Sequence, residues 1–322
     1  MTGTTGARPV PSLQTSAANP LSWYWIPITI GAALSQNVRT ALQKSLKGRL
    51  STNAANFTRY VYGVPFAIGY ALLLHQLGGD PWPAPGLRFF AWVVLGGLTQ
   101  IVATSLLIEA MTRRNFAAGI AYSKTEVVQA ALFEAIVLGA TMTLGGGAAI
   151  VLATIGVMLI SLKQATDPWR EFLLGWTDTG ALLGLASGGF FGVSAVAFRA
   201  ASLDLGHPSF LMSAGFTLAW AQSLQTLMLG AWLAWREPAQ LAAVARWWRP
   251  ALMVGFTGTL GSACWFTAFT IQVAAYVRTL GLIELIFTFL LARFAFKERP
   301  SRYEIAGVAL LCAGIALVLN LR

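Results

Sequence analysis

Polar and charged side chains inside long apolar runs are the groups of this sequence best placed to do chemistry. A charge at the centre of a bilayer costs about 2.5–3.5 kcal/mol on insertion scales, so each one needs an ionic partner, a wet cavity or a functional task. The candidates for lining a central polar cavity are Gln36, Asn37, Arg39, Glu126, Arg199, Trp265, Arg278 and Glu284. Arginines there would hold a carboxylate or phosphate group of a ligand, and a glutamate would take up a coupling proton.

The same side chains also have a structural interpretation. Glu126 and Glu284 would then pair with arginines of other helices and tie the bundle together, and Trp265 would only pack. We expect three charges near segment ends to snorkel toward the membrane interface: Arg59, Glu109 and Arg293. Both interpretations of the central charges stay open at this point.

The composition places these residues in a membrane protein. Apolar residues make up 56% of the 322 residues and charged residues 11%, against roughly 25% charged in soluble domains. Such a chain has too little polar surface to stay dissolved, so lipid must be its solvent. Cys264 and Cys312 lie in apolar runs and predict neither a disulfide nor a metal site, and we expect no cofactor.

The chain divides into ten apolar segments of about the length that crosses a bilayer, roughly 20 residues each. Because unpaired backbone groups in lipid are costly, all of them are predicted to be helices. The expected ranges are 22–43, 55–77, 89–111, 116–137, 143–162, 179–201, 208–235, 250–271, 274–296 and 303–321.

The two halves of the chain carry matching residues at a nearly constant spacing. Glu126 pairs with Glu284 and Gly156 with Gly314 at an offset of 158, and Arg39 pairs with Arg199 at an offset of 160. A repeat of five crossings is odd, so the second copy enters the membrane from the opposite side, as alternating access requires. The predicted organisation is a flexible tail over 1–20, a first repeat over 21–162, a connecting loop over 163–178 and a second repeat over 179–322.

The net charge of +10 is concentrated in five connections. Thirteen of the 22 Lys and Arg residues lie in the loops after the first, third, fifth, seventh and ninth segments, and three lie in the other loops and the tails. This distribution is typical of cytoplasmic loops and argues against nucleic-acid binding; it places both termini outside.

Catalytic motifs are absent from the sequence. It contains no HExxH, GxSxG or Walker motif, and His75 and His207 are isolated, so we expect a protein that is not an enzyme. Two rival classes stay open. One is an intramembrane enzyme that uses Glu126 or Glu284 as a general acid or base, and the other is a passive channel or structural membrane subunit.

The closing segments carry a family resemblance in Gly281-Leu282-Ile283-Glu284, in Phe296 to Ser301, and in the spaced glycines Gly307 and Gly314. The chain resembles the drug/metabolite transporter superfamily in its ten-helix EamA-type family. It departs from the family's Gly-Glu turn at Lys297-Glu298 and Gly139-Ala140. Many relatives have both termini in the cytoplasm, opposite to what the loop charges favour.

The resemblance implies an all-α integral membrane protein of two inverted five-helix repeats in the cell inner membrane. Its expected function is secondary transport, with export as the expected direction, of a small metabolite or drug-like molecule by alternating access through a central cavity. The expected partners are that small-molecule substrate, membrane lipid and a coupling proton or counter-substrate, with the protein a monomer or a homodimer.

Overall fold

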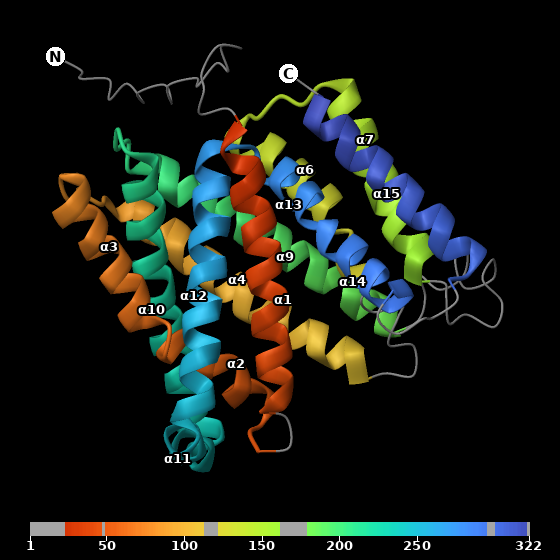
Figure 1. The fold of residues 1–322 in the computed structure, drawn as a ribbon. Helices are drawn as coiled ribbons and strands as arrows, with labels where there is room; N and C mark the ends of the chain where they lie inside the picture. The colour runs from red at the N-terminus through yellow and green to blue at the C-terminus, as the bar shows by residue number, and fades with distance from the viewer. Residues whose placement is uncertain (1–22, 47–48, 113–121, 162–178, 295–299, 321–322) are drawn as a thin grey trace, which may run out of the picture.

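The computed structural model describes residues 23–46, 49–112, 122–161, 179–294 and 300–320, and all of their regular secondary structure is helical (Figure 1). The all-α prediction is therefore confirmed for the described residues. The helices are α1 (Trp25–Ser45), α2 (Thr52–Val61), α3 (Val64–Gly78), α4 (Leu87–Thr112), α6 (Glu126–Leu138), α7 (Leu144–Ser161), α9 (Thr179–Asp204), α10 (Phe210–Arg236), α11 (Pro238–Arg246), α12 (Trp248–Ile271), α13 (Ala274–Gly281), α14 (Ile283–Phe294) and α15 (Arg302–Asn320).

Each of the ten predicted segments overlaps at least one of these helices. Five helical stretches are long and apolar enough to cross a membrane, and a sixth apolar helix over Leu144–Ile160 is shorter. The five are Thr52–Gly78, Leu87–Leu107, Thr179–Asp204, Trp248–Ile271 and Arg302–Asn320. The helical membrane architecture is thus supported, and the number of ten crossings stays a prediction.

Three predicted segments contain breaks, and in segment 116–137 the break is the turn at Lys124 and Thr125. The predicted segment 55–77 is interrupted between α2 and α3 at Tyr62 and Gly63, and Pro65 occupies the first turn of α3. A proline is tolerated in a first helical turn and not in a helix interior, so a new helix begins there. The predicted segment 274–296 is interrupted at Leu282, between α13 and α14.

Helix α11 was not predicted, because its nine residues are too short and too polar to cross a bilayer. Pro238 occupies its first turn, and the helix packs on α2, α10 and α12. Ser51, which caps α2, also donates a hydrogen bond to the Glu237 carboxylate just before α11. These contacts fix the end of the bundle farthest from the start of α1 (Figure 1).

The packing of helices is nearly unchanged when the two halves are exchanged. In the predicted correspondence α9 is the counterpart of α1, and α12 is the counterpart of α4. Helix α1 packs along α12, and α9 packs in the same way along α4. Helix α7 packs along its own counterpart α15. The spatial arrangement therefore follows the internal repeat.

Helices α7 and α15 run antiparallel at very close range. A Cβ added to Gly156 would lie 2.6 Å from the carbonyl oxygen of Gly307, and one added to Gly314 would lie 2.8 Å from that of Ala149. The offset of 158 converts the first contact into the second, because it carries residue 156 to 314 and residue 149 to 307. The two helices thus meet around a pseudo-twofold axis.

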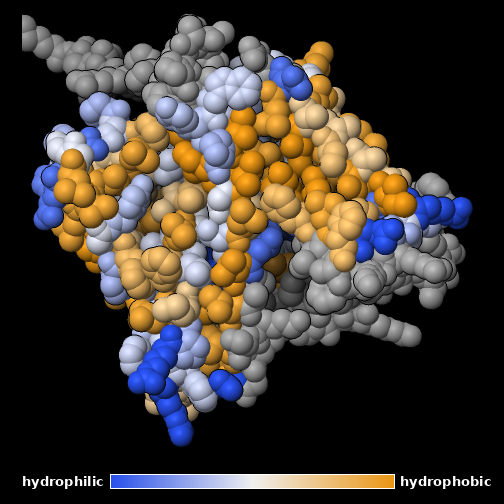
Figure 2. All heavy atoms as spheres, viewed as in Figure 1, coloured by the Kyte–Doolittle hydropathy of each residue, from blue (hydrophilic) through white to orange (hydrophobic). Residues whose placement is uncertain are grey.

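The outer surface of the bundle is strongly apolar. Leu77, Ile136 and Leu144 are each at least 79% exposed, and Figure 2 shows a largely hydrophobic face over α1, α14 and α15. Apolar patches of this extent are unusual on soluble monomers and mark a surface that contacts lipid or another protein.

Candidate functional site

Two helices, α6 and α14, begin inside the bundle at equivalent positions of the two halves. Helix α6 begins at Glu126 after a turn at Lys124 and Thr125, and α14 begins after the turn at Leu282 with Glu284 in its first turn. Leu282 follows Lys124 by the same 158 residues that separate the two glutamates. A carboxylate is stabilised in the first turn of a helix by the unpaired N–H groups and the helix dipole.

Each glutamate forms an ion pair with a cation of the other half. The Nζ atom of Lys124 lies 2.6 Å from Oε1 of Glu284, and Nη1 of Arg278 lies 3.5 Å from Oε1 of Glu126. Gln36 of α1 donates a hydrogen bond of 3.4 Å from Nε2 to Oε2 of Glu284. The two halves are therefore joined at the helix breaks by two reciprocal charge pairs.

Trp265 of α12 lies beside one of these pairs. The Cζ atom of Arg278 is 4.9 Å from the centroid of the Trp265 ring and 5.4 Å from that of Phe269, and the two rings stack at 5.7 Å. A Cβ on Gly281 would lie 2.4 Å from the indole of Trp265. The Trp265 ring thus packs against the guanidinium of Arg278. The same ring fills the space next to Gly281 that a larger side chain would occupy.

Arg199 occupies a different place, where its Nε and Nη1 atoms are bound by protein groups. Its Nε lies 2.8 Å from Oε1 of Glu134, and its Nη1 donates to the carbonyl oxygens of Phe269 and Gln272 at the end of α12. Glu134 in turn accepts hydrogen bonds from the backbone N–H of Ala274 and of Ala275, at the start of α13. This pair joins the end of α12 to the start of α13.

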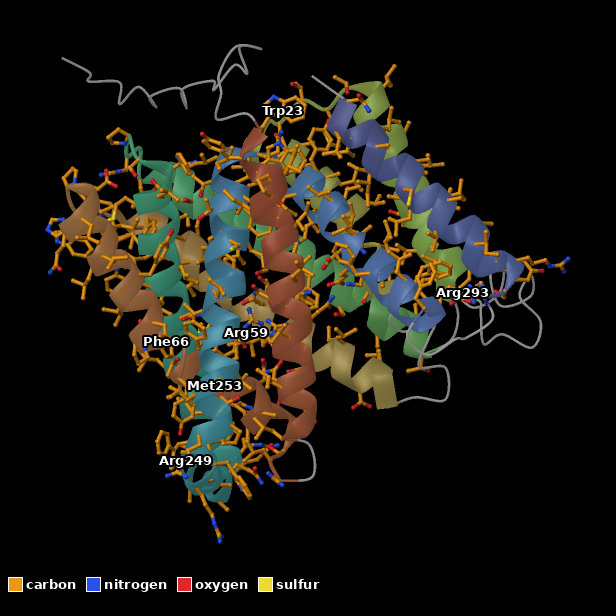
Figure 3. All side chains as sticks on the ribbon, viewed as in Figure 1. Trp23, Arg59, Phe66, Arg249, Met253 and Arg293 are labelled. Carbon is orange, nitrogen blue, oxygen red and sulfur yellow. The ribbon has the colours of Figure 1, made fainter. Side chains whose placement is uncertain are left out.

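Arg39 and Arg59 lie together against α12. A Cβ on Gly258 would be 3.4 Å from Cδ of Arg39 and 3.2 Å from Cγ of Arg59. The Nε atoms of both arginines are buried with no hydrogen-bond partner among the described residues. Figure 3 places Arg59 inside the bundle, near α12 and α1. Arg59, in the last turn of α2, therefore turns its side chain toward Arg39 and α12, not away from the bundle as snorkelling would require.

The break between α2 and α3 is lined by uncharged polar groups. Thr259 donates a hydrogen bond of 3.1 Å from Oγ1 to the carbonyl oxygen of Gly63, and Gln222 donates one of 3.2 Å to Thr259. A Cβ on Gly63 would lie 2.7 Å from Oγ1 of Thr259. The Gly63 carbonyl also accepts the N–H of Ala67 in α3, so the Thr259 hydroxyl adds a tertiary hydrogen bond at the break.

The charged centre is reached from the surface. The side chains of Lys124, Arg278 and Glu284 are 19%, 13% and 11% exposed, and Gln36, Asn37 and Arg39 are also only partly buried. In Figure 2 a recess with hydrophilic atoms opens between α1 and α14. Seven of the eight predicted site residues thus lie in α1, α6, α12, α13 and α14 around this region, and Arg199 lies apart from them in a closed pair.

The two halves each match one family along almost their whole length. The EamA-like transporter family matches residues 23–162 and again residues 178–320. The chain belongs to the EamA-like transporter family. Members of this family are small-molecule transporters of the membrane and not enzymes. This EamA family member is therefore a multi-pass membrane protein built on two copies of one repeat.

A protein of known crystal structure has the same fold as this EamA chain. The two superpose with a TM-score of 0.61 at 18% identity, over 92% of this chain and 97% of the other. At this identity the likeness shows the fold alone. No curated protein matches the sequence. Within the described residues no three His, Cys, Asp or Glu side chains are grouped to hold a metal ion.

Three residues that pair with the predicted site residues, or lie beside them, were not themselves predicted: Lys124, Glu134 and Arg59. Lys124 lies in the same predicted segment as Glu126, but no local signal indicates its partner Glu284 in the other half. Arg59 and Glu134 lie near the ends of the predicted segments 55–77 and 116–137. For Arg59 the signal was the pair Gly63 and Pro65, which marks a helix break. For Glu134 no local signal exists, because its partner Arg199 is distant in sequence.

Proposed function

We propose that this protein is a secondary transporter that moves a small metabolite or drug-like molecule by alternating access through a cavity between inverted repeats. The observation that supports the proposal best is the reciprocal pairing of Lys124 with Glu284 and of Glu126 with Arg278. These pairs join the repeats where the half-helices end, and a rearrangement of one repeat against the other must make or break them.

The proposed membrane arrangement has ten crossings and a pseudo-twofold axis in the membrane plane. The antiparallel contact between α7 and α15 supports it, because opposed copies are related by such an axis. Helix α1 begins and α15 ends at the same end of the molecule (Figure 1), as an even number of crossings requires. We place the protein in the cell inner membrane. The loop charges favour an outside location for the termini, and the family resemblance favours the cytoplasm.

The transport cycle follows from two packings of similar energy. When two repeats are alike, exchanging their conformations gives a second state that opens to the other side. A ligand or a proton favours one state only by its differential interaction with it. Protonation of Glu126 or Glu284 would weaken one inter-repeat pair and leave the other intact, which offers a route to proton coupling. Export, a counter-substrate in place of the proton, and a monomeric or homodimeric state stay predictions.

The rival reading as an intramembrane enzyme finds less support. A general acid or base needs a free proton-transfer site in reach of a substrate, and both glutamates are held by cations of the other repeat. A channel differs from a carrier by its kinetics. Carriers show saturable counterflow, because one conformational cycle moves a bound solute each way.

The experiment that tests the proposal starts with a search for the substrate. Amino acids, sugars, nucleotides, organic anions and organic cations are screened for thermal stabilisation of the purified protein, since a ligand of the native form raises its melting temperature by mass action. A labelled form of the stabilising compound is then followed in counterflow into proteoliposomes. We expect Lys124→Glu to reduce counterflow at least about tenfold, because a buried pair becomes two like charges.

The double variant Lys124→Glu with Glu284→Lys restores the charge pair, and we expect it to recover part of the counterflow. Recovery is partial because a lysine in the first turn of α14 opposes the helix dipole. The matched control is Arg88→Glu, which breaks a surface pair with Asp204 in which the Arg88 side chain is 67% exposed. Wild-type counterflow in Lys124→Glu would remove the inter-repeat pairs from the mechanism.

A further inference from the structure

Arg39 and Arg59 form a cationic pair in which neither guanidinium is in an ion pair with a carboxylate of the described residues. Around the helix breaks the described residues place four cations and two carboxylates, and the two carboxylates are in ion pairs with Lys124 and Arg278. Arg39 lies within electrostatic range of Arg59, Arg278 and Glu284, yet among the described residues no ion pair is formed by Arg39 or Arg59. Two positive charges are therefore in excess here.

The contrast with Arg199 shows what a satisfied arginine looks like in the same fold. Arg199 is the counterpart of Arg39 at the offset of 160, and it binds Glu134 and two carbonyl oxygens. The position that would match Glu134 in the second repeat is Ala292. The repeat thus supplies an acid to Arg199 and none to Arg39, so the asymmetry lies in the sequence itself.

The site around the two arginines is held in place by neighbours. Gly258 leaves the room in which both side-chain stems lie side by side. The Cζ atom of Arg59 lies 5.2 Å from the ring centroid of Tyr60, and the hydroxyl of Tyr60 is itself buried with no partner among the described residues. Three N–H or O–H groups, from Arg39 Nε, Arg59 Nε and Tyr60 Oη, are therefore buried at one place with no acceptor.

The pair lies within the bundle and not at its end. Arg39 lies six residues before the end of α1 and Arg59 seven residues after the start of α2, which at 1.5 Å per residue is about 10 Å from the end of the bundle. Both residues are partly exposed, although their Nε atoms are buried. Two uncompensated cations at that depth are costly, and an anion between them would relieve the cost.

We propose that Arg39 and Arg59 form the anion-binding part of the substrate site, and that the transported molecule carries a carboxylate or phosphate group. The guanidinium fork matches the paired oxygens of either group. This inference rests on the proposed transport function and adds its substrate class. It also removes Arg199 from ligand binding, because its Nε and Nη1 are already bound by Glu134 and the end of α12.

The test measures binding in detergent, where no transport is needed. Melting temperatures of the purified protein are followed while sodium phosphate, sodium succinate or choline chloride is titrated at constant ionic strength. We expect phosphate or succinate to raise the melting temperature and choline to leave it unchanged. The more effective of the two anions tells whether the group recognised is a phosphate or a carboxylate.

The variants Arg39→Gln and Arg59→Gln are each expected to raise the apparent dissociation constant of the effective anion at least about tenfold, since each removes charge-assisted hydrogen bonds. Arg88→Gln, the same substitution in the exposed pair with Asp204, is expected to bind like the wild type. Without added anion, Arg39→Gln should melt at or above the wild-type temperature because an unpaired cation has been removed, whereas Arg199→Gln should melt below it.

Three results would overturn the anion site: stabilisation by choline and not by the anions, unchanged anion binding in both Arg39→Gln and Arg59→Gln, or a loss of stability in Arg39→Gln equal to that in Arg199→Gln. None of these bears on transport itself. Conversely, arginine-dependent anion binding in a protein whose proteoliposomes exchange no stabilising solute would leave the site standing and reject the transport function.

Discussion

Charged side chains at the helix breaks sit where the helix dipole favours their sign. Glu126 and Glu284 lie in the first turns of α6 and α14, and Arg59 and Arg278 lie in the last turns of α2 and α13. Each such placement contributes about 0.3–1 kcal/mol when exposed, and up to about 2 kcal/mol when partly buried. Half-helices therefore let this protein keep ionised groups inside a bundle that lipid surrounds.

Glu134 is predicted to be the most stabilising single charge of the described part. Glu134→Gln leaves the buried Arg199 without a carboxylate and removes the anion from the start of α13, so we expect a loss of about 3–5 kcal/mol in the free energy of unfolding. The measurement is thermal unfolding in detergent, for Glu134→Gln, Arg199→Gln and the double variant.

The double variant should lose less than the sum of the two single losses, because the groups act as a pair. Asp204→Asn is the matched control, since it breaks the exposed pair with Arg88 and should cost under about 1 kcal/mol. Additive losses from Glu134 and Arg199 would show that the two do not act together.

At the scale of helices, close backbone contact between α7 and α15 joins the last helix of the first repeat to the last helix of the second. Membrane helices lack a hydrophobic drive to associate, so small residues that allow close approach supply much of the attraction. Gly156, Gly307 and Gly314 supply that approach here. The same contact recurs in both halves, so a defect at either site should act alike.

Gly156→Ala tests this contact against a control on the same helix. The added Cβ would lie 2.6 Å from the carbonyl oxygen of Gly307, so the helices must separate, and we expect a loss of about 1–3 kcal/mol. At Gly147 nothing lies within 4 Å of the added Cβ, so Gly147→Ala should be neutral or slightly stabilising through helix propensity. Equal melting temperatures for the two variants would argue against tight packing along α7.

At the scale of the whole molecule, exchange of the two halves preserves the packing of helices but not the chemistry. The packing of α1 on α12 is equivalent to the packing of α9 on α4. The side chains of Arg39 and its counterpart Arg199, however, have different partners. A symmetric frame gives two packings of comparable energy, and an asymmetric set of charges lets a ligand or a proton distinguish them.

The helical class, the family and the register of the repeat could all be predicted from the sequence. Apolar runs and the recurrence of Glu126 with Glu284 and of Gly156 with Gly314 are local or periodic signals, and the glycine pair proved to mark the contact of α7 with α15. The breaks at Gly63 and Leu282 were missed, because a break inside an apolar run changes composition very little. The partners of Arg199 and Glu284 were not predictable, since ion pairs are chosen by the three-dimensional packing.

The central claim is that opposed repeats enclose a charged cavity that opens to both sides of the membrane in turn. Its most direct test is Gln36→Cys in a background with Cys264→Ser and Cys312→Ser, treated with a membrane-impermeant thiol reagent in right-side-out and in inverted vesicles. Arg49→Cys and Asp80→Cys serve as markers of the two sides. The proposal predicts that each marker reacts from one side only, that the two sides differ, and that Gln36→Cys reacts from both. A Gln36→Cys that reacts from neither side, or markers that react from the same side, would contradict it.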